Sequence, residues 1–137
     1  MYKRQRFTLP KTEMTERIIT AMRDPHVSIL AHPTGRQGQA REPYDLDFDA
    51  VMQRAGQRGC FLELTGQPDR LGLTEIHAQR AREHGVLIAV DSDAHSMADL
   101  ANLHVAVGLA RRGWLEERDV LNARPLDALR ALLRRTT

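Results

Sequence analysis

Three short apolar segments, separated by stretches of helical periodicity, constrain the fold of this 137-residue chain more than any other feature. They cover residues 27–31, 60–64 and 86–90, and each is typical of a short buried strand. Apolar strands that alternate with helices are typical of parallel βαβ units, in which helices cover the faces of the sheet. We therefore predict an α/β fold of about three parallel strands, as a sheet or as part of a β/α barrel.

The predicted helices have recognisable ends. Asp47 and Thr74 are good N-cap residues, and Gly59 and Gly85 each follow the last residue of a helical pattern. Residues 1–11 carry four basic residues without a clear period, so we expect a basic tail or a truncated element there, followed by one domain over residues 12–137. The predicted helices cover residues 12–23, 48–58, 75–84, about 97–112 and 125–135.

The composition limits the class of protein. Hydrophobic residues make up 42% of the chain, which is enough for a buried core, and no apolar run approaches the ~18 residues of a membrane span. We expect no membrane association and no secretory signal, since no apolar stretch follows the basic N-terminus. The single cysteine excludes a disulfide within the chain and fits a cytoplasmic protein.

Polar side chains follow or end all three predicted strands. His32 comes directly after the first strand, Glu63 lies near the end of the second, and Asp93 and His95 follow the third. Because active sites of α/β proteins lie beyond the carboxyl ends of the strands, we expect these four side chains to meet at one edge. Imidazole and carboxylate groups together suit Zn, Mn or Fe, so the pattern predicts a metal-dependent hydrolytic site.

Phosphate is the ligand that the arginines suggest. Eighteen of the 20 basic residues are Arg, and Arg forms bidentate pairs with phosphate, although a compositional bias toward Arg explains the count equally well. Arg36 and Arg41 follow His32 in a long loop, and Arg70 lies in the loop after the second strand. We expect these three to bind phosphate near the metal; the alternative is that they are solvated loop residues.

The candidate site residues also have structural alternatives. Glu63 could be buried against Arg36 or Arg70 rather than lie in a site. Asp91, Asp93 and Ser96 could cap the helix that follows them. The remaining four histidines are assigned to surface or packing positions, and the apolar helix residues are assigned to the core, with Val51, Ile76 and Leu103 as examples.

Several motifs, in order, resemble one known family. Residues 29–36 read ILAHPTGR, residues 62–64 read LEL, residues 68–71 read PDRL, residues 92–96 read SDAHS and residues 110–115 read ARRGWL, followed by VLN at 120–122. This series resembles the PHP (polymerase and histidinol phosphatase) domain of bacterial family X DNA polymerases. The resemblance extends from about residue 7 to about residue 133.

The resemblance implies a fold, a cofactor and an activity. It implies a distorted, TIM-like β/α barrel that holds Zn or Mn ions and acts on phosphoesters at DNA ends, as a 3′-to-5′ exonuclease in DNA repair. It also implies that the metal ligands in this chain are His32, Asp93 and His95. Glu63 becomes a residue at the edge of the site, because the ligating Glu of the family belongs to an earlier segment.

The chain departs from the family pattern in ways that bear on activity. The HxH pair, a further His and a Glu of the N-terminal half of the domain are absent, and residues 4–7 replace a segment that ordinarily carries a ligand His. Thr65 and Gly72 replace an Asn and an Asp. We therefore expect the C-terminal part of a PHP domain that is not catalytically complete alone, with the missing half and a polymerase domain in the full-length protein.

Three other functions remain open from the sequence. The chain could be a stand-alone PHP-type phosphatase of a small phosphate ester. It could be a degenerate, non-catalytic domain that binds DNA or serves as a scaffold. It could also be an unrelated α/β binding domain whose histidines and aspartates are structural.

Overall fold

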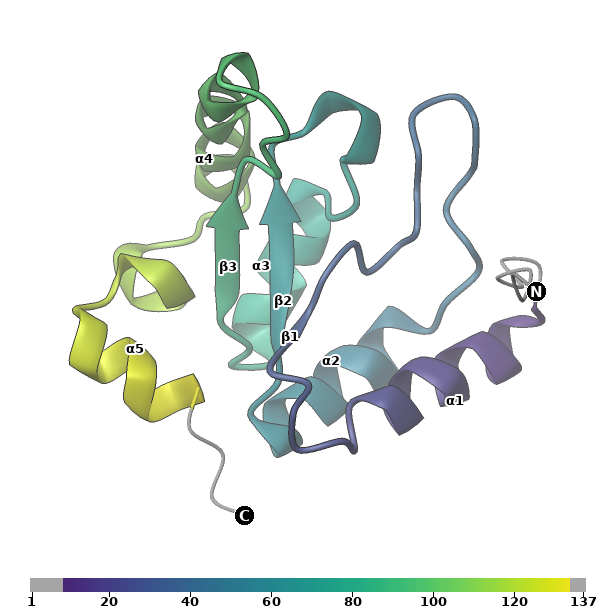
Figure 1. Cartoon of the computed structure of the whole chain (residues 1–137). Coiled ribbons are helices and arrows are strands. Elements are labelled where there is room, and N and C mark those ends of the chain that lie inside the picture. Colours follow the sequence, from purple (N-terminus) through teal and green to yellow (C-terminus); the bar gives the residue numbers. More distant parts are fainter. Residues whose placement is uncertain (1–8, 134–137) are drawn as a thin grey trace.

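The computed structural model describes residues 9–133, in which helices and parallel strands alternate (Figure 1). Most of the expected N-terminal tail lies outside this range, as do the last four residues of the chain. The helices are α1 (Lys11–Ala21), α2 (Phe48–Arg58), α3 (Glu75–Glu83), α4 (Leu103–Arg112) and α5 (Leu126–Leu133). The strands are β1 (Ile29–Leu30), β2 (Phe61–Thr65) and β3 (Ile88–Asp91), and the 3-10 turns are η1 (Pro68–Arg70), η2 (Ala98–Asn102), η3 (Glu117–Asp119) and η4 (Leu121–Ala123).

The three strands form one parallel sheet in the order β1-β2-β3. Ile29 is in register with Phe61, and Thr65 at the end of β2 is in register with Asp91 at the end of β3. The prediction of an α/β fold with three parallel strands is confirmed. The sheet is open over the described residues, so the barrel that the family resemblance implies is not established by these strands.

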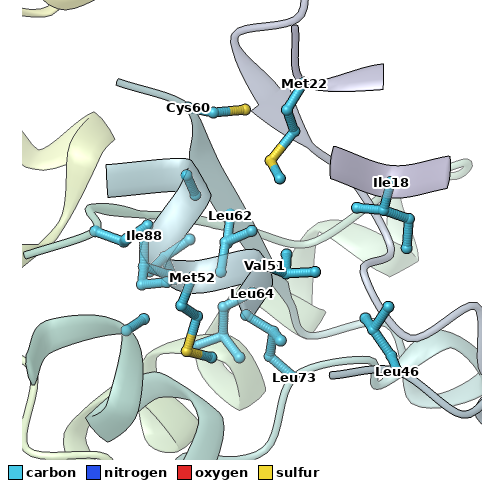
Figure 2. Close-up of a cluster of buried hydrophobic side chains, with 14 of the residues drawn as sticks. Ile18, Met22, Leu46, Val51, Met52, Cys60, Leu62, Leu64, Leu73 and Ile88 are labelled. Atoms are coloured by element: carbon cyan, nitrogen blue, oxygen red, sulfur yellow. The ribbon is translucent and has the colours of Figure 1, made fainter. Parts of the chain in front are cut away.

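The main core lies on the face of the sheet that carries Leu62, Leu64 and Ile88 (Figure 2). These side chains are fully buried against α1 and α2, and Val51 of α2 is fully buried among them. The core assignment of Val51 is therefore confirmed. The assignments of Ile76 and Leu103 are wrong, because their residues are 62% and 43% exposed on the outer faces of α3 and α4.

Most helix ends follow the expected signals. The Asp47 carboxylate accepts a hydrogen bond from the backbone N–H of Ala50 at 3.0 Å, and Gly59 ends α2 with a left-handed φ of 62°. The predicted helix over residues 97–112 is instead the 3-10 turn η2 followed by α4. The longest helices of residues 9–133 have 11 residues, and none is long and apolar enough to cross a membrane.

The outer edge of β3 is covered by the segment that follows α4. Val120 forms a parallel bridge with Ile88. The Asn122 side chain accepts a hydrogen bond from the Val90 N–H at 3.0 Å and donates one to the Val90 carbonyl at 2.8 Å. The side-chain amide thus pairs with β3 much as a neighbouring strand would.

Candidate metal and phosphate site

The carboxyl ends of the strands bring the candidate site residues to one edge of the sheet, where the arrowheads of β2 and β3 point (Figure 1). His32 lies two residues beyond β1, Glu63 is the central residue of β2, and Asp93 and His95 lie in the loop after β3. The parallel register makes this convergence unavoidable, because all three strands end on the same side. Asp91 ends β3 and joins the group, although the sequence suggested only a capping role for it.

Glu63 and His32 form the closest contact of the site. One Glu63 oxygen, Oε2, accepts a hydrogen bond from the His32 backbone N–H at 2.7 Å and lies 3.1 Å from Nδ1 of the same residue. His32 has a left-handed backbone conformation, with φ of 48°. The alternative that Glu63 is buried against Arg36 or Arg70 is wrong, since the carboxylate faces His32 instead.

Asp93 lies between the two histidines. Its Oδ2 is 3.7 Å from His32 Nε2, and its Oδ1 is 3.5 Å from His95 Nε2. The His95 side chain is 70% exposed, whereas that of Asp93 is 20% exposed, so the group opens to solvent on the His95 side. The structure thus brings His32, Asp93 and His95 together, as the sequence predicted; their role as ligands stays a prediction.

Burial shifts the acidity of two carboxyl groups at this edge. It raises the pKa of Glu63, while the hydrogen bond from the His32 backbone N–H opposes the shift. Burial also raises the pKa of Asp91, against the hydrogen bonds that its carboxylate accepts from the Thr65 hydroxyl and the Asp93 backbone N–H. A partly buried group of carboxylates favours a bound cation, because positive charge offsets both the burial and the mutual repulsion.

The three candidate phosphate-binding arginines differ in their surroundings. Arg70 Nε lies 3.7 Å from Asp93 Oδ2, so this arginine is part of the site. Arg41 Nε donates a hydrogen bond to the Gly35 carbonyl at 2.7 Å, which fastens the long loop after β1. Arg36 is exposed on the same loop. Among these three arginines, Arg70 is thus the one for which the structure shows an ion pair with Asp93, and the binding of phosphate by all three stays a prediction.

The capping alternatives apply to neighbouring residues rather than to the Asp93 side chain. Ser96 Oγ accepts a hydrogen bond from the Asp99 N–H at 3.3 Å, as a cap does. Asp91 Oδ1 accepts one from the Asp93 N–H at 3.2 Å, which shapes the loop after β3. The Asp93 carboxylate faces His32, His95 and Arg70 instead.

The donor set fits a divalent transition metal in its chemistry, and two of its separations are close to those between zinc ligands. Two ligands of a tetrahedral zinc ion, each about 2.1 Å from it, lie about 3.4 Å apart. The separations across Asp93 are 3.5 and 3.7 Å, and Asp93 Oδ2 is buried without a hydrogen-bond partner. Within residues 9–133, however, no group of three or more His, Cys, Asp or Glu residues is arranged to hold a metal ion as it stands.

Comparison with known proteins relates the chain to polymerases and phosphatases. It is 39% identical to DNA polymerase/3′-5′ exonuclease PolX of Bacillus subtilis (strain 168) over 129 residues, which are 94% of this chain and 23% of that protein. It is 32% identical over 114 residues to a probable phosphatase of Thermoanaerobacter sp. (strain X514), covering 79% of this chain and 44% of that protein. No protein-family model matches the chain.

A third relative extends the same pattern at lower identity. A probable phosphatase of Edwardsiella ictaluri (strain 93-146) is 28% identical over 127 residues, which are 88% of this chain and 49% of that protein. The chain thus spans less than half the length of each of the three relatives. The match to PolX over nearly the whole chain confirms that the chain resembles the C-terminal part of the PHP domain of bacterial family X DNA polymerases.

Proposed function

We propose that this chain is the C-terminal part of a PHP-type, metal-dependent phosphoesterase in which His32, Asp93 and His95 bind Zn or Mn. The observation that carries the proposal is the position of Asp93, whose two carboxylate oxygens each face one of these imidazoles at the carboxyl edge of the sheet. Imidazole and carboxylate ligands suit both ions. The similarity to an exonuclease and to phosphatases supports phosphoester hydrolysis as the reaction.

The side chains of the site have separate tasks in such a reaction. A bound ion would supply Lewis acidity, lowering the pKa of a water molecule and polarising a phosphoryl oxygen. Arg70, whose Nε lies 3.7 Å from Asp93, would pair with a non-bridging phosphate oxygen and hold the ester in place. Arg36 and Arg41 extend this positive region along the loop after β1, and Glu63 lies at its buried edge.

The substrate class that we propose is the 3′ end of DNA, with the chain acting as a 3′-to-5′ exonuclease in DNA repair. Support comes from the name of PolX and from the ARRGWL and HPTGR motifs. We further propose that the other ligands come from an N-terminal half of the domain, that a polymerase domain accompanies it, and that the protein acts in the cytoplasm. A partial barrel completed by that half would close the open sheet of the described residues.

A chimera tests the proposal. This chain would replace the aligned segment of the Bacillus subtilis PolX protein, and exonuclease activity would be measured on a 3′-labelled oligonucleotide with Mn and with EDTA. We expect Mn-dependent activity, and we expect His95→Ala to lower it at least about 100-fold while the exposed control His104→Ala retains it. Equal activity of the His95→Ala chimera would contradict the ligand assignment.

The phosphatase relatives support a second candidate, hydrolysis of a small phosphate ester. Their alignments cover 79% and 88% of this chain, against 94% for PolX. The chimera distinguishes the two when it is also assayed on p-nitrophenyl phosphate, because a small-ester phosphatase would hydrolyse this substrate and leave the oligonucleotide intact. DNA binding without hydrolysis of either substrate would favour a non-catalytic role.

A further inference from the structure

Glu63 has an unusual place for a carboxylate. It is the central residue of the central strand, every residue of β2 is buried, and Glu63 itself is 8% exposed. The ion-pair partner that the structure gives it is the His32 ring. A buried carboxylate at such a position is costly unless it is hydrogen-bonded, so its hydrogen-bond partners indicate what it does.

One oxygen of Glu63 faces both the backbone N–H and the ring of His32. Oε2 accepts the His32 backbone N–H at 2.7 Å and lies 3.1 Å from the ring nitrogen Nδ1. The ring does not yet complete a hydrogen bond, since Nδ1 is buried without a partner in hydrogen-bond geometry. The distance is that of a hydrogen bond, so a small rotation of the imidazole completes it.

The other ring nitrogen of His32 faces the candidate metal site. Nε2 lies 3.7 Å from Asp93 Oδ2, whereas Glu63 lies on the Nδ1 side of the ring. A neutral imidazole carries its proton on one nitrogen only. A carboxylate beside Nδ1 holds the proton there and leaves the lone pair of Nε2 for a ligand.

We propose that Glu63 is a positioning residue, not a ligand: it holds the His32 backbone and ring so that the unprotonated Nε2 faces the same ion as Asp93 and His95. This inference rests on the proposed function, because it assigns Glu63 a role toward the proposed Zn or Mn site. The backbone contact matters as much as the ring contact. His32 has a left-handed φ of 48°, which a residue with a side chain adopts only when its surroundings enforce it.

The tautomer of His32 tests the inference without any metal. ¹⁵N-correlated NMR spectra of the full metal-free chain at about pH 8 report which ring nitrogen carries the proton. We expect the Nδ1–H tautomer in the wild type, retention of that tautomer in Glu63→Gln, whose amide oxygen can still accept, and a mixture of tautomers in Glu63→Leu. A mixture in the wild type, or an unchanged spectrum in Glu63→Leu, would overturn the proposal.

Metal affinity supplies the second readout. In a calorimetric titration with Zn, we expect Glu63→Leu to weaken binding by about 10–100-fold and Glu63→Gln to weaken it less. Glu83→Leu, at an exposed position of α3, is the control and should bind as the wild type does. Urea unfolding in EDTA shows whether each variant folds, so that a folding defect is not mistaken for lost ligation.

The two readouts separate the inference from the proposed function. A wild type that binds no Zn or Mn contradicts the metal site, while the tautomer still decides whether Glu63 positions the ring. If Glu63→Leu binds Zn as tightly as the wild type does, the role of Glu63 is contradicted and the assignment of the ligands is unaffected.

Discussion

Two residues of the proposed site have backbone conformations that side chains disfavour. His32 and Asp93 have φ values of 48° and 45°, and outside the site Trp114 has a φ of 57°. Such conformations cost about 1–3 kcal/mol each and persist where neighbouring contacts enforce them. The Glu63 carboxylate supplies that contact at His32, and the Asp91 carboxylate supplies it at Asp93. Conformational strain is therefore concentrated at the carboxyl edge of the sheet.

Gly35 provides a test of how tightly the loop after His32 is packed. It has a φ of 61°, and a Cβ added there would overlap the ring of Tyr44, which is half-buried beneath the loop. We expect Gly35→Ala to lower the free energy of unfolding by about 2–4 kcal/mol, from the backbone conformation and the overlap together. Gly59 has a φ of 62° and open space around its Cα, so Gly59→Ala should cost only about 1–2 kcal/mol. Urea denaturation measures both, and equal costs would contradict the packing of Tyr44 on Gly35.

His77 predicts a pH dependence of stability that is unrelated to the site. Its ring stacks on Phe48, its Nδ1 accepts the Thr74 N–H at 3.2 Å, and burial, with Arg80 nearby, lowers its pKa. The unfolded chain therefore binds the proton more readily, so stability is complete above about pH 6.5 and falls as the pH drops toward the lower folded pKa.

The matched variant for this prediction is His77→Gln. Glutamine keeps the acceptor of the capping box and does not titrate. We expect the variant to lose less stability than the wild type between about pH 6.5 and pH 5, as urea unfolding at each pH would show. Parallel stability curves for the two proteins would contradict the assignment of this titration to His77.

The candidate site was predictable from the sequence where strand order alone determines it. His32, Asp93 and His95 follow strands that are parallel, so their convergence follows from the topology. The partner of Glu63 was not predictable, because it depends on the left-handed turn at His32 rather than on residue type or spacing. The contact of Arg41 was not predictable either, because its residue type and its place in a loop do not distinguish it from Arg70. In the structure Arg41 donates a hydrogen bond to Gly35 of its own loop.

For single helices and strands, the hydrophobic periods predicted where each element lies. They did not predict which side of each helix is exposed. The caps at Asp47 and Thr74 lie where the sequence predicts them, and each of the three strands overlaps its predicted range, although β1 has only two residues. Ile76 and Leu103 were assigned to the core because apolar residues usually face it, yet both are exposed. The direction in which a helix turns its apolar residues depends on its neighbours, which local periodicity does not contain.

The edge of β3 depends on one side chain. Asn122 makes two hydrogen bonds to the backbone of Val90, and Leu121 beside it is buried against Phe61 and Ala89. We expect Asn122→Ala to lower the free energy of unfolding by about 1–3 kcal/mol, since two backbone groups lose their partners. Gln53→Ala, at an exposed position of α2, is the control and should change it by less than about 0.5 kcal/mol. Equal effects would contradict the role of Asn122 at this edge.

At the scale of the whole molecule, the side that carries η2 and α4 exposes apolar residues. The exposed side chains there are Met97, Leu100, Leu103, Val105 and Val107. Leu103 and Val107 also line an apolar groove with Val90 and Val120. Exposed apolar surface of this kind promotes association.

We expect the purified chain to self-associate in a concentration-dependent way. The double variant Leu103→Lys with Val107→Lys should shift the molecule toward the monomer in sedimentation velocity, because charge at these positions disfavours burial. Ile76→Lys, at a more exposed apolar position on α3, is the control and should leave association unaltered. A wild type that is monomeric over a hundredfold range of concentration would contradict this prediction.

The proposed reaction requires that the carboxyl edge of the sheet holds a metal ion through His32, Asp93 and His95. Calorimetric titration of the chain with Zn and with Mn tests it most directly, using the wild type, His95→Ala and the exposed control His104→Ala. We expect weak binding by the wild type and the control, and none by His95→Ala. Identical binding by all three proteins, or no binding by the wild type, would contradict it.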